Sequence, residues 1–199
     1  VLQMIASQIA YCASLGADVE FVALDATRSE SAFLASAMTA AKNAGATYFS
    51  LCDSEGVMTP VEFTAFLEEF TCNNPEIAVY PIDVATSDEL SMACANSIAA
   101  LCGKAGGVKT TLLGNYAVRL DALVRTVALR GNDLSLSMTV DSTGVRRAVS
   151  SMPWLNGSKR ESAATAVEAK QEDNEILLSR GMSISQISEV ISHLGYVLT

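Results

Sequence analysis

The stretch VEFVALDATRSESAFLASAMTAAKNAGATYFSLCDSEG, residues 19–56, decides the fold of this chain. A short apolar run (19–24) leads into a segment with helical periodicity (29–45), and a second apolar run (46–52) follows. Short, continuous apolar runs are typical of strands that are covered on both faces. The stretch therefore predicts two strands with a helix between them.

The same arrangement recurs further along the chain. Apolar runs at 77–84 and 108–113 follow the first two at intervals of about thirty residues, which is the length of a βα unit. Pro81 weakens the third run as a central strand, because proline has no backbone N–H to donate. Successive βα units imply a parallel sheet with right-handed crossovers. Either a doubly wound sheet or part of a (β/α)₈ barrel fits this pattern.

Helices are expected between and around these strands. Thr59, Pro60 and Glu62 form the pattern of a capping box with a favoured proline, so a helix should begin there. The segment 89–107 is apolar almost all round, which is typical of a buried helix. Further helices are expected over 1–16 and over 116–131, the latter ended by Gly131.

From residue 132 the pattern becomes irregular, and two more helices are expected at 161–180 and 184–194. We therefore divide the chain into a βα region, 1–131, and a helical extension, 132–199. The chain begins inside an expected helix and without a methionine, so we expect it to be a piece of a longer protein.

Composition excludes several classes of function. A formal net charge of −9 and a pI near 4.5 argue against a nucleic-acid partner, because phosphates need a positive surface. No apolar run is long enough to span a membrane. The five cysteines are odd in number and lack CxxC spacing, which indicates buried thiols in a reducing cytoplasm. A zinc site is the remote alternative, since His193 is the only histidine and is expected to be an ordinary polar-face residue.

Polar residues follow the first two predicted strands. Asp25 and Arg28 come after the first, and Asp53 and Ser54 come after the second. The carboxyl ends of barrel strands carry the chemistry of such folds, and a carboxylate beside a guanidinium can position an acidic substrate or a metal-bound water. The alternatives are a structural pair that caps the next helix and, for Asp53 and Ser54, an ordinary turn.

Three motifs in order resemble one family. The segments DATRS (25–29), DSEGVMTP (53–60) and ANSIAA (95–100) are similar to signatures of the metallolyase barrel family. This family contains 2-isopropylmalate synthase, homocitrate synthase, citramalate synthase and HMG-CoA lyase. The resemblance covers about residues 1–130. It implies a TIM-barrel-type α/β fold in which this chain supplies about four βα units, half of a (β/α)₈ barrel, followed by a helical extension.

The resemblance also implies a divalent metal, Mg, Mn or Zn, held in the family by an aspartate on the first strand and two histidines on the seventh. Counting back from ANSIAA, the histidine positions fall at Ala85 and Ser87, and neither side chain replaces an imidazole. Asn115 matches an asparagine that contributes to the family's metal shell. Asp83, Asp88 and Glu89 offer oxygens to a hard ion such as magnesium, the alternative being a solvated loop. The first-strand aspartate is absent from this chain.

The function implied by the resemblance is an acyltransferase of amino-acid biosynthesis that condenses acetyl-CoA with a 2-oxo acid. Asp25 and Arg28 would be catalytic, and Asp53 and Ser54 would bind the substrate. The alternative, motivated by the missing histidines, is an inactive relative that serves as a small-acid-binding, regulatory or partner subunit. In either case we expect a cytoplasmic protein, completed by a missing N-terminal half or by a second copy in a homodimer.

Overall fold

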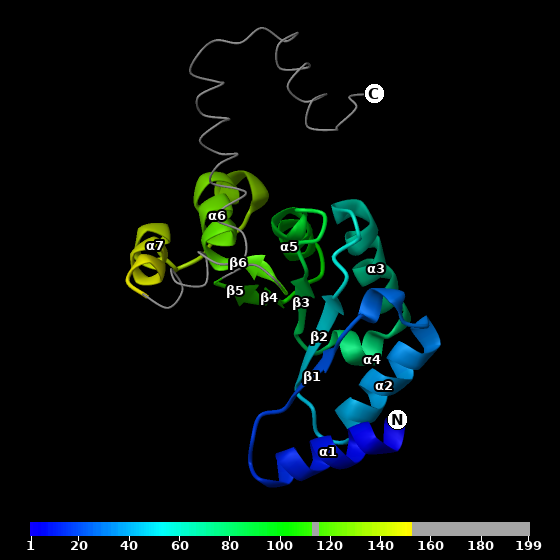
Figure 1. Ribbon diagram of the computed structural model, residues 1–199. Coiled ribbons are helices and arrows are strands. Elements are labelled where there is room, and N and C mark those ends of the chain that lie inside the picture. Colours follow the sequence, from blue (N-terminus) through cyan, green and yellow to red (C-terminus); the bar gives the residue numbers. More distant parts are fainter. Residues whose placement is uncertain (113–115, 153–199) are drawn as a thin grey trace, which may run out of the picture. The chain divides into compact units, whose positions relative to one another are not determined.

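A computed structural model describes residues 1–112 and 116–152 (Figure 1). A sheet of four strands lies at the centre of the compact unit formed by residues 1–148. The strands follow one another in chain order: β1 (Glu20–Ala23), β2 (Tyr48–Asp53), β3 (Ile82–Thr86) and β4 (Gly107–Val108). Every neighbouring pair is parallel. The predicted α/β fold of parallel βα repeats is confirmed.

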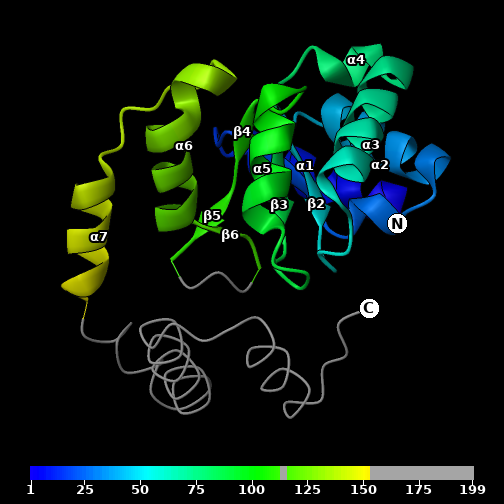
Figure 2. The same cartoon turned by 90° about the horizontal axis from the view of Figure 1, so that it is seen from above.

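Helices connect and cover these strands. They are α1 (Leu2–Ser14), the short 3₁₀ turn η1 (Ala26–Arg28), α2 (Ser31–Asn43), α3 (Pro60–Asn73), α4 (Pro75–Ala78), α5 (Ala93–Cys102), α6 (Leu120–Leu134) and α7 (Ser142–Ser150). Two further short strands, β5 (Thr110–Thr111) and β6 (Val118–Arg119), pair in parallel with each other. In the view from above, α2, α3, α5 and α6 follow one another in chain order (Figure 2).

The main core lies between one face of the sheet and helices α2, α3 and α5. The strands contribute Phe49, Leu51, Ile82 and Val84, which are all buried. The helices contribute Leu34, Met38, Phe63, Leu67, Phe70 and Ala100. Because side chains alternate along a strand, the intervening residues lie on the opposite face of the sheet. We call that opposite face the inner face; it carries Glu20, Ser50, Cys52, Asp83 and Ala85.

The predicted start of α3 is confirmed. The Thr59 hydroxyl accepts a hydrogen bond from the backbone N–H of Glu62, and the Glu62 carboxylate accepts one from the backbone N–H of Thr59 at 2.8 Å. Pro60 occupies the first turn. The helix therefore begins where the capping box places it and carries its apolar side toward the sheet.

Several element boundaries differ from the sequence-based expectation; the fourth apolar run, 108–113, is divided between β4 and the separate strand β5. Residues 77 and 78 belong to helix α4, and the third strand begins only after Pro81. Helix α5 begins at Ala93, because the Asp88 carboxylate accepts a hydrogen bond from its backbone N–H. Helix α6 runs past Gly131 to Leu134. Glycine is needed inside this helix, since a Cβ at Gly131 would lie 2.4 Å from the carbonyl oxygen of Leu136.

The expectation of buried thiols holds for only part of the cysteines. Cys52 is buried and Cys94 is half-buried, whereas Cys12, Cys72 and Cys102 are exposed. The expectation was wrong for these three because apolar runs also supply the outward faces of helices. The helices expected at 161–180 and 184–194, with His193, lie outside the described residues. Among the described residues, no helix has the length and apolar character needed to cross a membrane.

Candidate functional site at the carboxyl edge of the sheet

Asp25 and Arg28 form an ion pair directly after β1. Asp25 adopts the left-handed conformation, with φ of 55°, and opens the turn η1 that brings Arg28 back over it. Arg28 donates from Nε to Oδ1 at 2.9 Å and from Nη2 to Oδ2 at 2.7 Å, which is a bidentate pair. These hydrogen bonds from Arg28 lower the pKa of the Asp25 carboxyl. Arg28 Nη2 also lies 3.5 Å from Glu55 Oε1.

The ends of β1 and β2 are joined by a direct hydrogen bond. The backbone N–H of Asp25 donates to Ser54 Oγ at 2.9 Å. Because the strands are parallel, both carboxyl ends lie at one edge of the sheet, as the sequence pattern predicted. The structure thus brings Asp25, Arg28 and Ser54 together.

Asp53 is fully buried and holds the loop that leads from β2 to α3. Its Oδ1 accepts hydrogen bonds from Thr27 Oγ1 and from the backbone N–H of Gly56, each at 3.2 Å. Its Oδ2 accepts one from the backbone N–H of Met58, also at 3.2 Å. As the last residue of β2 it lies on the helix-facing side of the sheet, whereas Ser54 lies at the rim. The carboxylate is therefore occupied by donors of its own chain.

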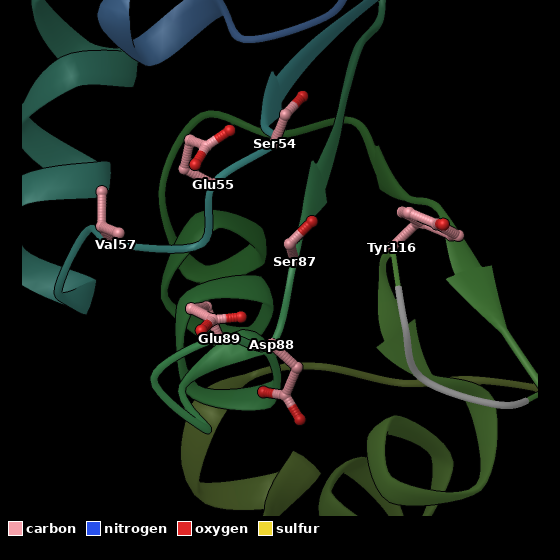
Figure 3. A pocket seen from close by; sticks show the side chains of 7 residues that line it. All are labelled: Ser54, Glu55, Val57, Ser87, Asp88, Glu89 and Tyr116. Carbon is pink, nitrogen blue, oxygen red and sulfur yellow. The ribbon is translucent and has the colours of Figure 1, made fainter. Parts of the chain in front are cut away.

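A cavity of about 530 Å³ opens at the same edge (Figure 3). Its lining residues follow β2 and β3 and precede β6: Ser54, Glu55, Val57, Ser87, Asp88, Glu89 and Tyr116. In Figure 3, Ser87 lies between Ser54 and Glu55 on one side and Tyr116 on the other. Of the four residues predicted to be catalytic or substrate-binding, Ser54 lines the cavity. Arg28 lies next to it through its contact with Glu55.

Asn96 is a residue of this region that sequence reasoning treated only as part of a motif. It is fully buried on α5, and its Nδ2 donates to the carbonyl of Met58 at 2.8 Å. Its Oδ1 has no hydrogen-bond partner among the described residues. Asn96 and Asp53 thus hold the loop before α3 from two sides. Two neighbouring polar residues, Asn96 and Ser97, in a largely apolar helix are the signal that points to it.

A polar cluster lies lower on the inner face. Lys109 Nζ donates to the Glu20 carboxylate at 2.8 Å, and Ser50 Oγ donates to the same carboxylate. Although burial alone would raise the pKa of Glu20, these hydrogen bonds lower it. Asp83 lies nearby over Gly107, where a Cβ would be 2.6 Å from its Oδ1. Burial raises the pKa of Asp83. This cluster was not predicted, because the strands were expected to be apolar on both faces.

The residues at the expected histidine positions do not fit a transition metal. Ala85 is 8% exposed and packs against Cys52 and Ala117, and Ser87 offers one hydroxyl. Among residues 1–112 and 116–152, no group of three or more His, Cys, Asp or Glu is arranged to hold a metal. Asp88 caps α5, and Asp83 lies lower on the inner face. Asn115 lies outside the described residues.

A parallel βα sheet with polar residues at its carboxyl edge defines a chain of the (β/α)₈-barrel type. The HMGL-like family model matches residues 1–149, so the chain belongs to the HMGL-like family. The resemblance predicted from the three short motifs is thereby confirmed.

Known relatives extend this assignment. A 2-isopropylmalate synthase from Synechococcus sp. (strain RCC307) is 32% identical over 148 residues, which cover 74% of this chain and 25% of that protein. The chloroplastic methylthioalkylmalate synthase 1-1 from Eutrema japonicum is 35% identical over 115 residues, which cover 57% of this chain and 23% of that protein. The chain thus spans about a quarter of the length of these curated relatives.

Solved structures share the fold. HMG-CoA lyase from Bacillus subtilis is similar with a TM-score of 0.64 at 13% identity, over 79% of this chain and 55% of that chain. The carboxyl transferase domain of Rhizobium etli pyruvate carboxylase, solved with pyruvate, is similar with a TM-score of 0.56 at 17% identity, over 72% of this chain and 25% of that chain. The TIM-barrel-type architecture implied by the family resemblance is therefore confirmed.

Proposed function

We propose that this protein is an acyltransferase that condenses acetyl-CoA with a 2-oxo acid, and that the chain forms the part of the barrel that binds the oxo acid. The most direct support for this proposal is the hydrogen bond that joins the carboxyl ends of β1 and β2. Asp25, Arg28 and Ser54 meet at one edge of a parallel sheet, beside a cavity of about 530 Å³. The synthases among its relatives support the same class of reaction.

Arg28 is the residue proposed to bind the substrate carboxylate. Its bonds to Asp25 use Nε and Nη2, so the ion pair leaves the two N–H groups of Nη1 to bind a ligand, and no described residue accepts a hydrogen bond from them. A guanidinium suits a carboxylate because its planar fork matches two oxygens at once. Glu55 lies on the cavity side of Arg28, and a bound anion would displace this longer contact of 3.5 Å.

Asp25 and Asp53 are proposed to position other groups. The lowered pKa of Asp25 keeps its carboxylate ionised and makes it a weak proton acceptor, so it orients the guanidinium. Asp53 accepts three hydrogen bonds from its own chain and fixes the loop that carries Ser54. Ser54 then presents its hydroxyl to the cavity, where it can contact the oxo acid.

Acetyl-CoA is the proposed co-substrate, and the cytoplasm is the proposed location. The remainder of the barrel is proposed to come from further residues of the same protein or from a second copy. The divalent metal of the family is not included, because the residues at Ala85 and Ser87 do not fit it.

A second candidate function is binding of a small acid without turnover, as a regulatory or partner subunit. The contact of Ala85 with Cys52 and Ala117 favours it, because no imidazole stands at that position to hold a metal that polarises the oxo group. In both candidate functions Arg28 binds the acid; they differ only in whether the protein then condenses it with acetyl-CoA.

Release of CoA from acetyl-CoA tests the proposal. The full chain is incubated with acetyl-CoA and with pyruvate or a longer 2-oxo acid, and CoA is quantified by chromatography. We expect release that depends on the oxo acid and falls by about a hundredfold in kcat/KM in Arg28→Gln. Arg130→Gln is the matched control, because Arg130 pairs with Asp133 in the same i,i+3 spacing away from the cavity. Binding of the oxo acid without release of CoA would contradict the acyltransferase proposal and support the second candidate function.

A further inference from the structure

The β5–β6 pair contacts the inner face of the sheet at the edge that carries the cavity. Ala117 is 4% exposed and packs against Cys52 and Ala85. The contact joins the end of β2, the end of β3 and the residue before β6. Thr111 Oγ1 donates to the carbonyl of Ala117 at 3.2 Å, which ties β5 to the same residue.

This contact fills the space above Ala85. Cys52 and Ala85 are direct neighbours across the β2–β3 pair, so a side chain that rises from position 85 meets Ala117. An imidazole has several heavy atoms more than a methyl group and would displace Ala117. Overfilling a packed contact of this kind is destabilising.

The neighbouring position is also fixed. The backbone N–H of Ser87 donates to the carbonyl of Asp53 at 3.0 Å. The loop after β2 passes so close that a Cβ at Gly56 would lie 2.4 Å from the carbonyl oxygen of Ser87. Ser87 therefore has little freedom to move its backbone and bring an oxygen to an ion.

Three of the acidic residues near this edge, Asp83, Asp88 and Glu55, make contacts within the chain, while Glu89 lines the cavity. Asp88 Oδ1 caps α5 at 2.9 Å from the N–H of Ala93. Asp83 lies lower on the inner face, beside Lys109 and Glu20, whose charges act on it. Glu55 pairs with Arg28. These carboxylates do not converge on one point, and the described residues hold no cluster suited to a metal.

We propose that the apolar contact of Ala117 with Ala85 and Cys52 has taken the place of a metal centre in this chain. The contact anchors β6 to the inner face and holds Tyr116 at the rim of the cavity. This edge therefore holds no divalent ion. The replacement of the metal centre by this packing does not depend on whether the protein turns over acetyl-CoA.

Binding of Mn²⁺ by the full chain tests the proposal first, with the free ion followed by electron paramagnetic resonance. Mn²⁺ is chosen because it prefers oxygen and imidazole over the exposed thiols. We expect no saturable uptake up to millimolar metal. Uptake that persists in the quadruple variant Glu55→Gln, Asp83→Asn, Asp88→Asn, Glu89→Gln lies elsewhere and agrees with the proposal. Stoichiometric uptake that this variant abolishes overturns it.

Hydrogen exchange tests the packing directly. In Ala85→His we expect peptides that contain β5 or β6 to exchange about tenfold faster, because the ring displaces Ala117. Ala85→Ser is the matched control and should leave this exchange nearly unchanged. Ala117→Leu overfills the same contact from the opposite side. It replaces Ala85→His in this test if that variant does not fold. Unchanged exchange in both enlarged variants would show that the space is open, which contradicts the proposal.

Discussion

Gly56 is the residue on which the loop geometry at the carboxyl edge depends most. It has a φ of 64°, and a Cβ there would lie 2.4 Å from the carbonyl oxygen and 2.7 Å from the carbonyl carbon of Ser87. Asp53 accepts the backbone N–H of the same glycine. Gly56 thus allows the loop after β2 to pass over the end of β3, where both line the cavity.

Gly56→Ala should therefore be far more destabilising than a glycine substitution of similar conformation elsewhere. Gly16 has a φ of 77° and nothing within 4 Å of the Cβ position, so Gly16→Ala carries backbone strain alone. We expect a loss of about 1 kcal/mol for Gly16→Ala and about 3 kcal/mol or more for Gly56→Ala. Urea unfolding of both variants measures the difference. Equal losses would show that the loop does not approach Ser87 this closely.

Single residues were predicted only in part. The spacing of Asp25 and Arg28 after a strand was sufficient to predict an ion pair at the carboxyl edge. The direction of Asp53 was not predictable, because successive strand residues point to opposite faces and the strand's last residue was not known. The packing of Ala117 on Ala85 could not be predicted from the sequence, since it joins residues far apart in the chain.

At the scale of the elements, the start of α3 is the clearest agreement between sequence and structure. The Thr59–Glu62 capping box satisfies backbone donors that the first turn of a helix leaves open. Such local patterns are predictable because all the interacting groups lie within four residues. The third strand was predicted too early for the opposite reason: apolar Ile77 serves the core equally well from a helix.

Thr59→Ala should lower the free energy of unfolding by about 1 kcal/mol, because it removes the cap of α3. Thr47→Ala is the control, since Thr47 is exposed and precedes β2 outside any helix. Thermal or urea unfolding measures both. A loss in Thr47→Ala as large as that in Thr59→Ala would mean that the capping box contributes nothing specific.

The inner face of the sheet makes stability depend on pH through Asp83. Burial raises the pKa of this carboxyl above its unfolded value, Lys109 partly opposes the rise, and Glu20 adds to it. The contribution of Asp83 is then favourable below the unfolded pKa of about 3.9 and is lost as the pH rises through the folded pKa.

Asp83→Asn should accordingly stabilise the chain at pH 7, and the gain should shrink toward zero as the pH falls below the carboxyl range. Urea midpoints of the variant and the wild type across this range measure it. Asp18→Asn, at an exposed position, controls for the loss of one negative charge. A gain at pH 7 that persists at low pH would show that burial of the carboxylate is not its cause.

At the scale of the whole molecule, no helix among residues 1–112 and 116–152 covers the inner face of the sheet as α2, α3 and α5 cover the other face. Tyr48, Val22 and Leu24 are exposed although they lie on or next to this face. The chain corresponds to 55% of the HMG-CoA lyase chain that shares its fold. A partial barrel explains both the exposed apolar residues and the location of the cavity at one edge.

The parallel α/β class was predictable because the βα period survives in the sequence, and the barrel and the family were predictable because three motifs kept their order. The state of the metal site was not predictable, because other ligands could stand in for the two histidines that the resemblance leads one to expect. The proposal that no metal is held here rests on the packing above Ala85 and the separate contacts of the nearby acids among the described residues.

Calorimetric titration of the full chain with pyruvate and longer 2-oxo acids, in the presence and absence of EDTA, tests the account most directly. The account predicts saturable binding that EDTA does not change, that Arg28→Gln weakens about tenfold or more, and that Arg130→Gln leaves intact. Binding that EDTA abolishes, or that Arg28→Gln leaves unchanged, would contradict it.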